Sequence, residues 1–210
     1  MARNYVFAPG EYYHVYSRGF EKLPVFRSVS DYNRFVEGLY LFNNIQPVGV
    51  RNKKKILDQG LTLVRNVYEI ERGDTLTDIG AYCLMPNHIH LLVREKNEKG
   101  ISKFMQKLMT SYTMYFNKKY DRTGAIFGSS FKARHVTSDT HLKYLFAYIH
   151  MNPKEIVKTG KLKNYRYSSY PDYLQHKRPQ RAILNQTAFP DYFEGAMEKE
   201  IRGWLSQTKV

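Results

Sequence analysis

The sequence predicts an α+β protein in which helices cover an antiparallel β-sheet. Residues 12–18 are rich in β-forming side chains. Two short apolar runs flank Pro86-Asn87, a dipeptide that favours the turn of a β-hairpin. Residues 101–116 and 141–152 instead repeat apolar side chains at helical spacing.

The first predicted strand spans residues 12–18, and the following Gly19 terminates it. Alternation along this strand places four side chains on one face: Tyr12, His14, Tyr16 and Arg18. That face is either a polar ligand-binding face or the wetter side of the sheet. Ser30 and Asp31 then offer an N-cap for an amphipathic helix that extends to Tyr40 and packs on the sheet.

The hairpin carries the first candidate site. Because side chains alternate along a strand, His88 and His90 project from one face, while Ile89, Leu91 and Val93 share the other. Two imidazoles placed in this way can offer two nitrogens to one divalent metal ion. They can equally satisfy hydrogen bonds beside a core, and the pair alone does not decide between these functions.

Two further segments are assigned from composition. Residues 46–78 are predicted to be an insertion that contains a hairpin or loop. A basic cluster within it, residues 51–55, either contacts phosphates or is a solvated loop. Residues 125–136 are predicted to be extended and to form the last strand, which presents Lys132, Arg134 and His135.

The helix over residues 141–152 carries the second candidate site. Tyr148 and Asn152 are four residues apart and therefore lie on one face, with Tyr144 one turn earlier. The amide oxygen is a hard ligand that could complete a metal site begun by two imidazoles. Alternatively, Tyr148 packs in the core and Asn152 caps the helix end. His150 is rotated by roughly 200 degrees from Tyr148, so we do not assign it as the base for this tyrosine.

The composition points to an anionic partner. The 210 residues include 33 Lys and Arg against 19 Asp and Glu, a net charge of +14. A field of this sign attracts phosphate backbones or anionic lipid head groups. No apolar run approaches the ~20 residues of a spanning helix and no secretory signal is recognisable, so we expect no membrane partner. The single cysteine, Cys83, excludes an internal disulfide, and we expect a reducing, cytoplasmic location.

Three sequence blocks follow one another in the order of a known family. They are Tyr-His-Val-Tyr-Ser-Arg-Gly in the first strand, Ala-Tyr-Cys-Leu-Met-Pro-Asn-His-Ile-His-Leu-Leu-Val in the hairpin, and Tyr-Ile-His-Met-Asn-Pro at the helix end. In these blocks the chain resembles the REP-associated tyrosine transposases, a group of the IS200-like transposases. These proteins are HUH single-strand endonucleases, named for a His-hydrophobic-His motif. The resemblance covers roughly residues 10–175.

The resemblance implies a ferredoxin-like fold, in which helices pack on the faces of an antiparallel sheet. At matching positions, His88 and His90 correspond to the metal-binding histidines of the family. Asn152 falls where the helix supplies the third ligand, and Tyr148 matches the single nucleophilic tyrosine. The implied cofactor is a divalent metal ion, either Mg²⁺ or Mn²⁺.

The resemblance also implies a function. The expected activity is that of a metal-dependent transposase that cleaves and rejoins single-stranded DNA at hairpin-associated sites through a 5′-phosphotyrosine. Lys132, Arg134 and Lys143 are candidates for contacting single-stranded or hairpin DNA. Members act as monomers or homodimers. The alternative is a non-catalytic DNA- or RNA-binding protein derived from a transposase, which would need neither the metal ligands nor the aligned phenol.

These features suggest one transposase domain over residues 1–175. Residues 176–210 are then a C-terminal extension, in which an amphipathic helix is expected from Phe189 to Trp204.

Overall fold

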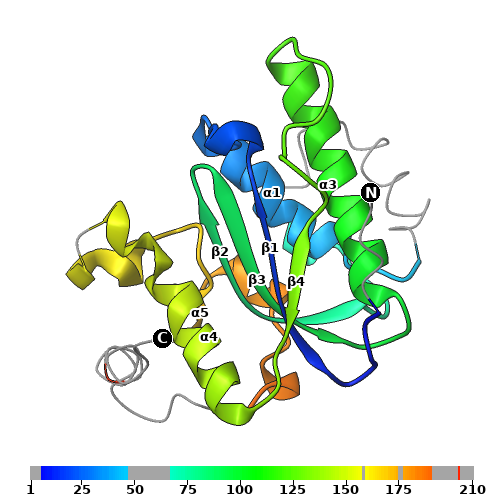
Figure 1. Cartoon of the computed structure of the whole chain (residues 1–210), viewed down its shortest axis with the longest axis vertical. Coiled ribbons are helices and arrows are strands. Elements are labelled where there is room, and N and C mark those ends of the chain that lie inside the picture. The colour runs from blue at the N-terminus through cyan, green and yellow to red at the C-terminus, as the bar shows by residue number, and fades with distance from the viewer. Residues whose placement is uncertain (1–5, 47–66, 158, 175–176, 191–202, 204–210) are drawn as a thin grey trace.

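A computed structural model describes residues 6–46, 67–157, 159–174, 177–190 and 203. Within these residues, four antiparallel strands form one sheet in the order β2-β3-β1-β4 (Figure 1). The strands are β1 (Tyr12–Arg18), β2 (Thr77–Met85), β3 (His88–Glu95) and β4 (Lys132–His135). The short strand β4 forms one edge of the sheet, beside β1.

The helices cover both faces of this sheet (Figure 1). Two of them, α1 (Val29–Leu41) and α3 (Gly100–Lys119), pack together on one face, and α4 (Asp139–Met151) packs on the other. A single helical turn, α5 (Tyr170–Tyr173), follows α4. The order β1-α1-β2-β3-α3-β4 is that of a ferredoxin-like fold. The predicted α+β, ferredoxin-like class is therefore confirmed.

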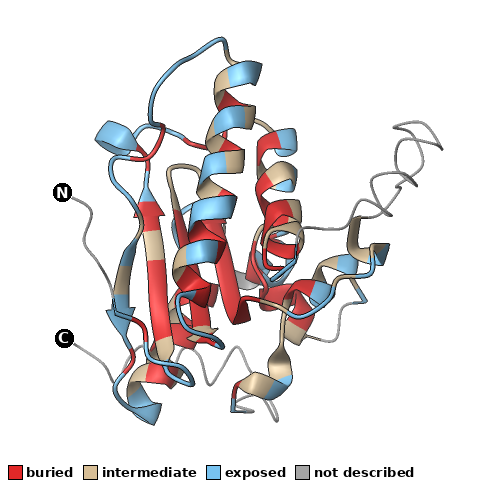
Figure 2. Ribbon diagram, turned by 90° about the vertical axis from the view of Figure 1, so that its right-hand side faces the viewer, coloured by how far each residue is buried: buried red, intermediate tan, exposed pale blue. Residues whose placement is uncertain are grey.

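Strand periodicity divides the apolar side chains between two cores. Val15, Ile89 and Leu91 point toward α1 and α3, whereas Cys83 and Leu92 point toward α4. Figure 2 shows the buried residues concentrated along the strands and on the sheet-facing sides of the helices, with exposed residues on the outer helix surfaces. Because both faces are covered, every residue of β2 is buried.

The structure corrects several predicted boundaries. Helix α1 is capped by Ser28 rather than by Ser30 or Asp31, because Asp31 sits at the third helical position and completes a capping box. Strand β2 begins at Thr77, so the end of the predicted insertion belongs to the sheet. The last strand is confined to Lys132–His135. Earlier in the segment 125–136, Phe127 forms an isolated bridge with Gly19.

The C-terminal part of the described chain lies along the free edge of β2. The backbone N–H of Asn185 donates to Ile79 O, and the Tyr12 hydroxyl donates to Ala188 O. Phe189 lies against Gly80, where an added Cβ would come within 2.6 Å of the Phe189 ring. Phe189 itself is extended, and the rest of the helix expected after it lies outside the described residues apart from one helical position.

Most of the predicted insertion also lies outside the described residues, including the basic cluster at 51–55. In the part that is described, Val67–Glu69 form a 3-10 turn. Among the helices described, none is long and apolar enough to cross a membrane.

Candidate functional site

The hairpin histidines and the helix tyrosine meet on the α4 face of the sheet. His88 and His90 point toward this face because they alternate with the buried Ile89. Their ring centroids are 5.0 Å apart, and the His90 ring lies edge-on to Tyr148 at 5.4 Å and 87°. His88 Nε2 is 3.2 Å from Asn152 Oδ1. The four predicted side chains are thus brought together from two segments that are distant in sequence.

Helix α4 presents Tyr148 and Asn152 through its own amphipathic pattern. Its apolar residues Leu142, Leu145 and Ile149 are buried in the core beneath the helix. Tyr148 and Asn152, which are only half-buried, border this stripe. The packing of α4 onto the sheet therefore fixes the phenol and the amide beside the two imidazoles.

Each imidazole is held at its Nδ1 atom by a second polar side chain. His90 Nδ1 lies 2.8 Å from His14 Nε2, and both rings are buried. His88 Nδ1 lies 2.6 Å from Asn87 Oδ1. Neither His14 nor Asn87 was among the site residues predicted from the sequence. The sequence indicated a role for His14 only through its place on the polar face of the first strand, with Tyr16 and Arg18. Asn87 was interpreted only as a turn residue.

Burial disfavours the charged form of all three imidazoles of the site. Desolvation lowers the pKa of His14 to about 4, and the nearby Arg134 and His141 lower it further. The pKa of His90 falls to about 2 through burial, with smaller contributions from His14, His88 and Arg18. Burial also lowers the pKa of His88, partly offset by the nearby Asn152 amide oxygen. A neutral imidazole is the form that binds a metal ion.

The hydrogen-bond pattern around His88 fits a divalent cation. The Asn87 amide nitrogen donates to Lys22 O at 2.9 Å, which turns Asn87 Oδ1 toward His88. His88 Nδ1 must then carry the proton, so its Nε2 presents a lone pair to Asn152 Oδ1. Two facing acceptors and a second imidazole form a donor set that could hold a divalent metal ion. Across the described residues, no three His, Cys, Asp or Glu side chains are grouped so that they could hold a metal ion. The further oxygen beside His88 is that of the Asn152 amide.

Two cavities open on either side of Tyr148. The larger, of about 510 Å³, extends toward the end of β1, and the smaller, of about 320 Å³, extends toward Tyr144. Three side chains line both cavities: Tyr16, His90 and Tyr148. Tyr148 therefore stands between two spaces that can each accept part of an extended ligand.

Two of the three cations predicted to contact DNA line these cavities. Lys132 borders the larger cavity and Arg134 the smaller. The two residues are two positions apart on β4 and therefore share one face of the strand. Lys143 lines neither cavity and forms an ion pair of 2.8 Å with Asp139. Arg18 lines the larger cavity opposite His88 in the β-sheet register, and it was not predicted as a DNA contact.

The other polar residues of α4 occupy different positions. Tyr144 stacks on Tyr148 with ring centroids 6.1 Å apart, and it lines only the smaller cavity. Its ring makes no described contact with His88 or His90. His150 is buried away from the site, where its Nε2 lies 2.7 Å from the Ser169 hydroxyl, and burial lowers its pKa to about 3. The structure thus agrees with leaving His150 out of the site.

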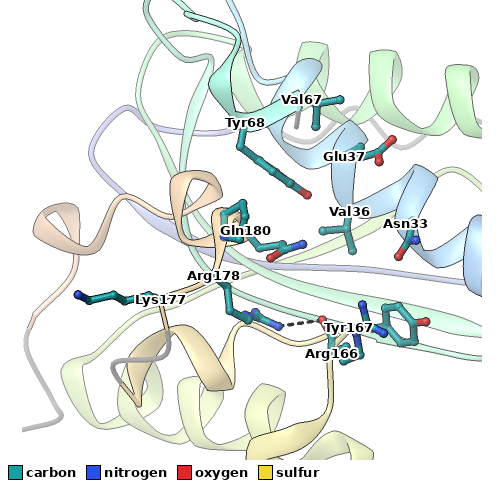
Figure 3. Close-up of a pocket in the computed structure, with 11 residues that line it drawn as sticks. Asn33, Val36, Glu37, Val67, Tyr68, Arg166, Tyr167, Lys177, Arg178 and Gln180 are labelled. Atoms are coloured by element: carbon teal, nitrogen blue, oxygen red, sulfur yellow. Dashed lines mark hydrogen bonds between the residues drawn. The ribbon is translucent and has the colours of Figure 1, made fainter. Parts of the chain in front are cut away.

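A further cavity of about 510 Å³ lies beside α1 and contains none of the predicted site residues. Its walls come from α1, the 3-10 turn at 67–69 and the segments around 166 and 178 (Figure 3). Arg178, the most prominent cation there, already binds Asp172 and the carbonyl oxygens of Arg166 and Ser168.

Comparisons with known proteins find similarity to transposases, both in sequence and in fold. The family model described as "Transposase IS200 like" matches residues 50–152, a range that contains both histidines, Tyr148 and Asn152. Over these residues the chain is similar to the IS200-like transposases.

The fold is also that of a solved REP-associated tyrosine transposase, whose structure was determined bound to a REP hairpin. The similarity has a TM-score of 0.54 and covers 93% of this chain and 92% of the other, at 12% sequence identity. No curated protein gives a sequence match to the chain.

Proposed function

We propose that the protein is a metal-dependent endonuclease and transposase that cleaves and rejoins single-stranded DNA at hairpin-associated sites through a 5′-phosphotyrosine. The observation that carries this proposal is the meeting of His88, His90, Tyr148 and Asn152 at one position between two cavities. DNA binding alone would require neither a metal-type donor set nor a phenol beside it. The hairpin bound by the structurally similar transposase supports the choice of substrate.

Tyr148 supplies the nucleophile in this proposal. Its hydroxyl oxygen attacks the phosphorus of one phosphodiester, so that an Oη–P bond forms as the P–O3′ bond breaks. The phenol proton passes to solvent, and the departing O3′ takes up a proton to become a 3′ hydroxyl. The reverse attack by a 3′ hydroxyl on the phosphotyrosine restores a phosphodiester without any nucleotide cofactor, because the bond energy is retained in the covalent link.

His88, His90 and Asn152 would hold the divalent ion, Mg²⁺ or Mn²⁺. When bound, this ion polarises the phosphate and offsets the charge that develops on its oxygens. The chain itself contributes orientation, since the strand and the helix fix the imidazoles and the phenol before substrate arrives.

The surroundings of Tyr148 suit an unpaired strand. Arg18 and Lys132 border one cavity and Arg134 the other, so phosphates on either side of the scissile bond can each meet a cation. Tyr16 and Tyr144 supply aromatic faces on which unpaired bases can stack.

The test uses the purified protein with end-labelled hairpin oligonucleotides that carry single-stranded flanks, in the presence of Mn²⁺. We expect a covalent protein–DNA band on a denaturing gel with wild type, and no such band with chelator or with Tyr148→Phe. Tyr148→Phe should still bind the hairpin, because binding does not need the hydroxyl. Tight, salt-dependent binding with no covalent band for any hairpin would favour the alternative of a non-catalytic nucleic-acid-binding protein.

A further inference from the structure

We infer that His14 and Asn87 are positioning residues that hold His90 and His88 in the Nδ1–H tautomer, so that both Nε2 lone pairs face Tyr148 and Asn152. The consequence for metal binding rests on the proposed function. The His88 tautomer itself does not, because it follows from hydrogen bonds within the chain.

The assignment for His88 comes from Asn87, whose amide is fixed from both ends. A backbone carbonyl can only accept a hydrogen bond, so the contact of 2.9 Å with Lys22 O identifies Nδ2 as the donor atom of Asn87. Asn87 Oδ1 therefore faces His88 Nδ1 at 2.6 Å, and this nitrogen must donate. A neutral imidazole has one N–H, which leaves His88 Nε2 as a lone pair.

The turn that supplies the Lys22 carbonyl is held in an uncommon conformation. Glu21 and Lys22 have φ values of 50° and 63°, in the left-handed region that non-glycine residues rarely adopt. The same turn is anchored to the hairpin because Gly19 N–H donates to Asn87 O at 2.8 Å. This left-handed turn directs the Lys22 carbonyl toward Asn87, the residue that orients His88.

The assignment for His90 comes from His14 on the adjacent strand. Their rings are nearly parallel, at 18° with centroids 5.0 Å apart, and only one proton can lie between His90 Nδ1 and His14 Nε2. We infer that His90 donates that proton, which leaves its Nε2 as a lone pair in a ring that lies 5.4 Å from Tyr148. Metal-binding histidines commonly donate their other ring N–H in this way, which fixes both the tautomer and the ring orientation.

The direct test is nuclear magnetic resonance of the metal-free wild type with ¹⁵N-labelled histidine, in which ring nitrogen shifts distinguish the two tautomers. We expect both His88 and His90 to be Nδ1–H. Observation of His90 or His88 as the Nε2–H tautomer would overturn the inference for that residue, whatever the DNA-cleaving activity of the protein.

Substitutions of His14 and Asn87 then test whether these residues support metal binding. His14→Phe keeps an aromatic ring but removes the acceptor, whereas His14→Gln offers an amide oxygen. We expect His14→Phe and Asn87→Ala to weaken Mn²⁺ binding about 10- to 100-fold, and His14→Gln to restore most of it. His135→Gln is the matched control, because His135 lies on the neighbouring strand and pairs with Glu11 on the surface.

Mn²⁺ affinity is measured by titration of the DNA-free protein, with thermal unfolding as the check on folding. Unchanged Mn²⁺ affinity in folded His14→Phe and Asn87→Ala would contradict the positioning role. If both tautomers are as inferred and Mn²⁺ binds, yet no covalent DNA adduct forms, the proposed function fails while this inference stands.

Discussion

Asn152 is a neutral residue at a position where many metal sites have a carboxylate. Its amide oxygen lies 3.2 Å from His88 Nε2 at the end of α4. If this oxygen is a metal ligand, Asn152→Ala should slow cleavage about 10- to 100-fold at low Mn²⁺, with a smaller deficit at high Mn²⁺. Single-turnover cleavage across a Mn²⁺ series measures this, with Asn152→Asp as the variant that keeps an oxygen ligand. A rate of Asn152→Ala equal to that of wild type throughout the series would show that Asn152 only caps the helix.

Sequence periodicity predicts the site residues as two separate pairs. Strand alternation predicted that His88 and His90 share a face, and helix spacing predicted the same for Tyr148 and Asn152. Neither pattern could bring the two pairs together, because that depends on how α4 packs on the sheet; only family resemblance supplied the link. The partner role of His14 required the register of β1 on β3, which sequence periodicity does not determine.

At the scale of elements, Asp31 joins the start of α1 to the end of α3. Its fully buried carboxylate accepts hydrogen bonds from Lys119 at 2.6 Å, from Tyr120 at 2.7 Å and from the Arg27 amide at 2.8 Å. Burial alone would raise the pKa of Asp31, but these donors outweigh it and lower the pKa from 3.8 to about 2. The carboxylate therefore ties two helices together beneath the same face of the sheet.

This arrangement predicts a specific dependence of stability on pH. Because the folded pKa is lowered, the stabilisation is present above the ordinary pKa of Asp31 and is lost as pH falls from about 4 toward 2. Asp31→Asn should lower the free energy of unfolding at pH 7 by about 1–2 kcal/mol, with a smaller difference from wild type at pH 2. Urea unfolding at several pH values measures this. Asp74→Asn, whose side chain is 85% exposed, is the control, and a pH-independent difference for Asp31→Asn would contradict the prediction.

The elements were predictable to different degrees. The hairpin and the long helix α3 were predicted closely, because a Pro-Asn turn and a sustained helical repeat are strong local signals. The cap of α1 was misplaced because Ser28, Ser30 and Asp31 all suit a helix start, and only the capping box selects Ser28. The last strand was predicted too long, since β-forming composition does not show where sheet pairing ends.

In the molecule as a whole, composition sets the net charge of +14. Whether a given cation can contact DNA depends on where it lies in the fold. Lys132 and Arg134 line the two cavities beside Tyr148, whereas Lys143 is paired with Asp139. Lys132→Ala and Arg134→Ala should each reduce the slope of log affinity against log salt by about 0.7 for single-stranded DNA. Lys143→Ala is the matched control, with a smaller change expected. Equal effects of all three variants in fluorescence anisotropy titrations would indicate a diffuse field rather than a defined path for the strand.

The proposed mechanism requires Tyr148 to be the nucleophile, and the covalent adduct identifies the attacking residue directly. After reaction with a hairpin oligonucleotide and Mn²⁺, nuclease trimming leaves a nucleotide remnant on the attacked side chain. Trypsin then releases residues 144–154 as one peptide that contains both Tyr144 and Tyr148, so fragmentation mass spectrometry can distinguish them. We predict that the remnant is on Tyr148. A remnant on Tyr144, or on Tyr16 across the cavity, would contradict the assignment of the site.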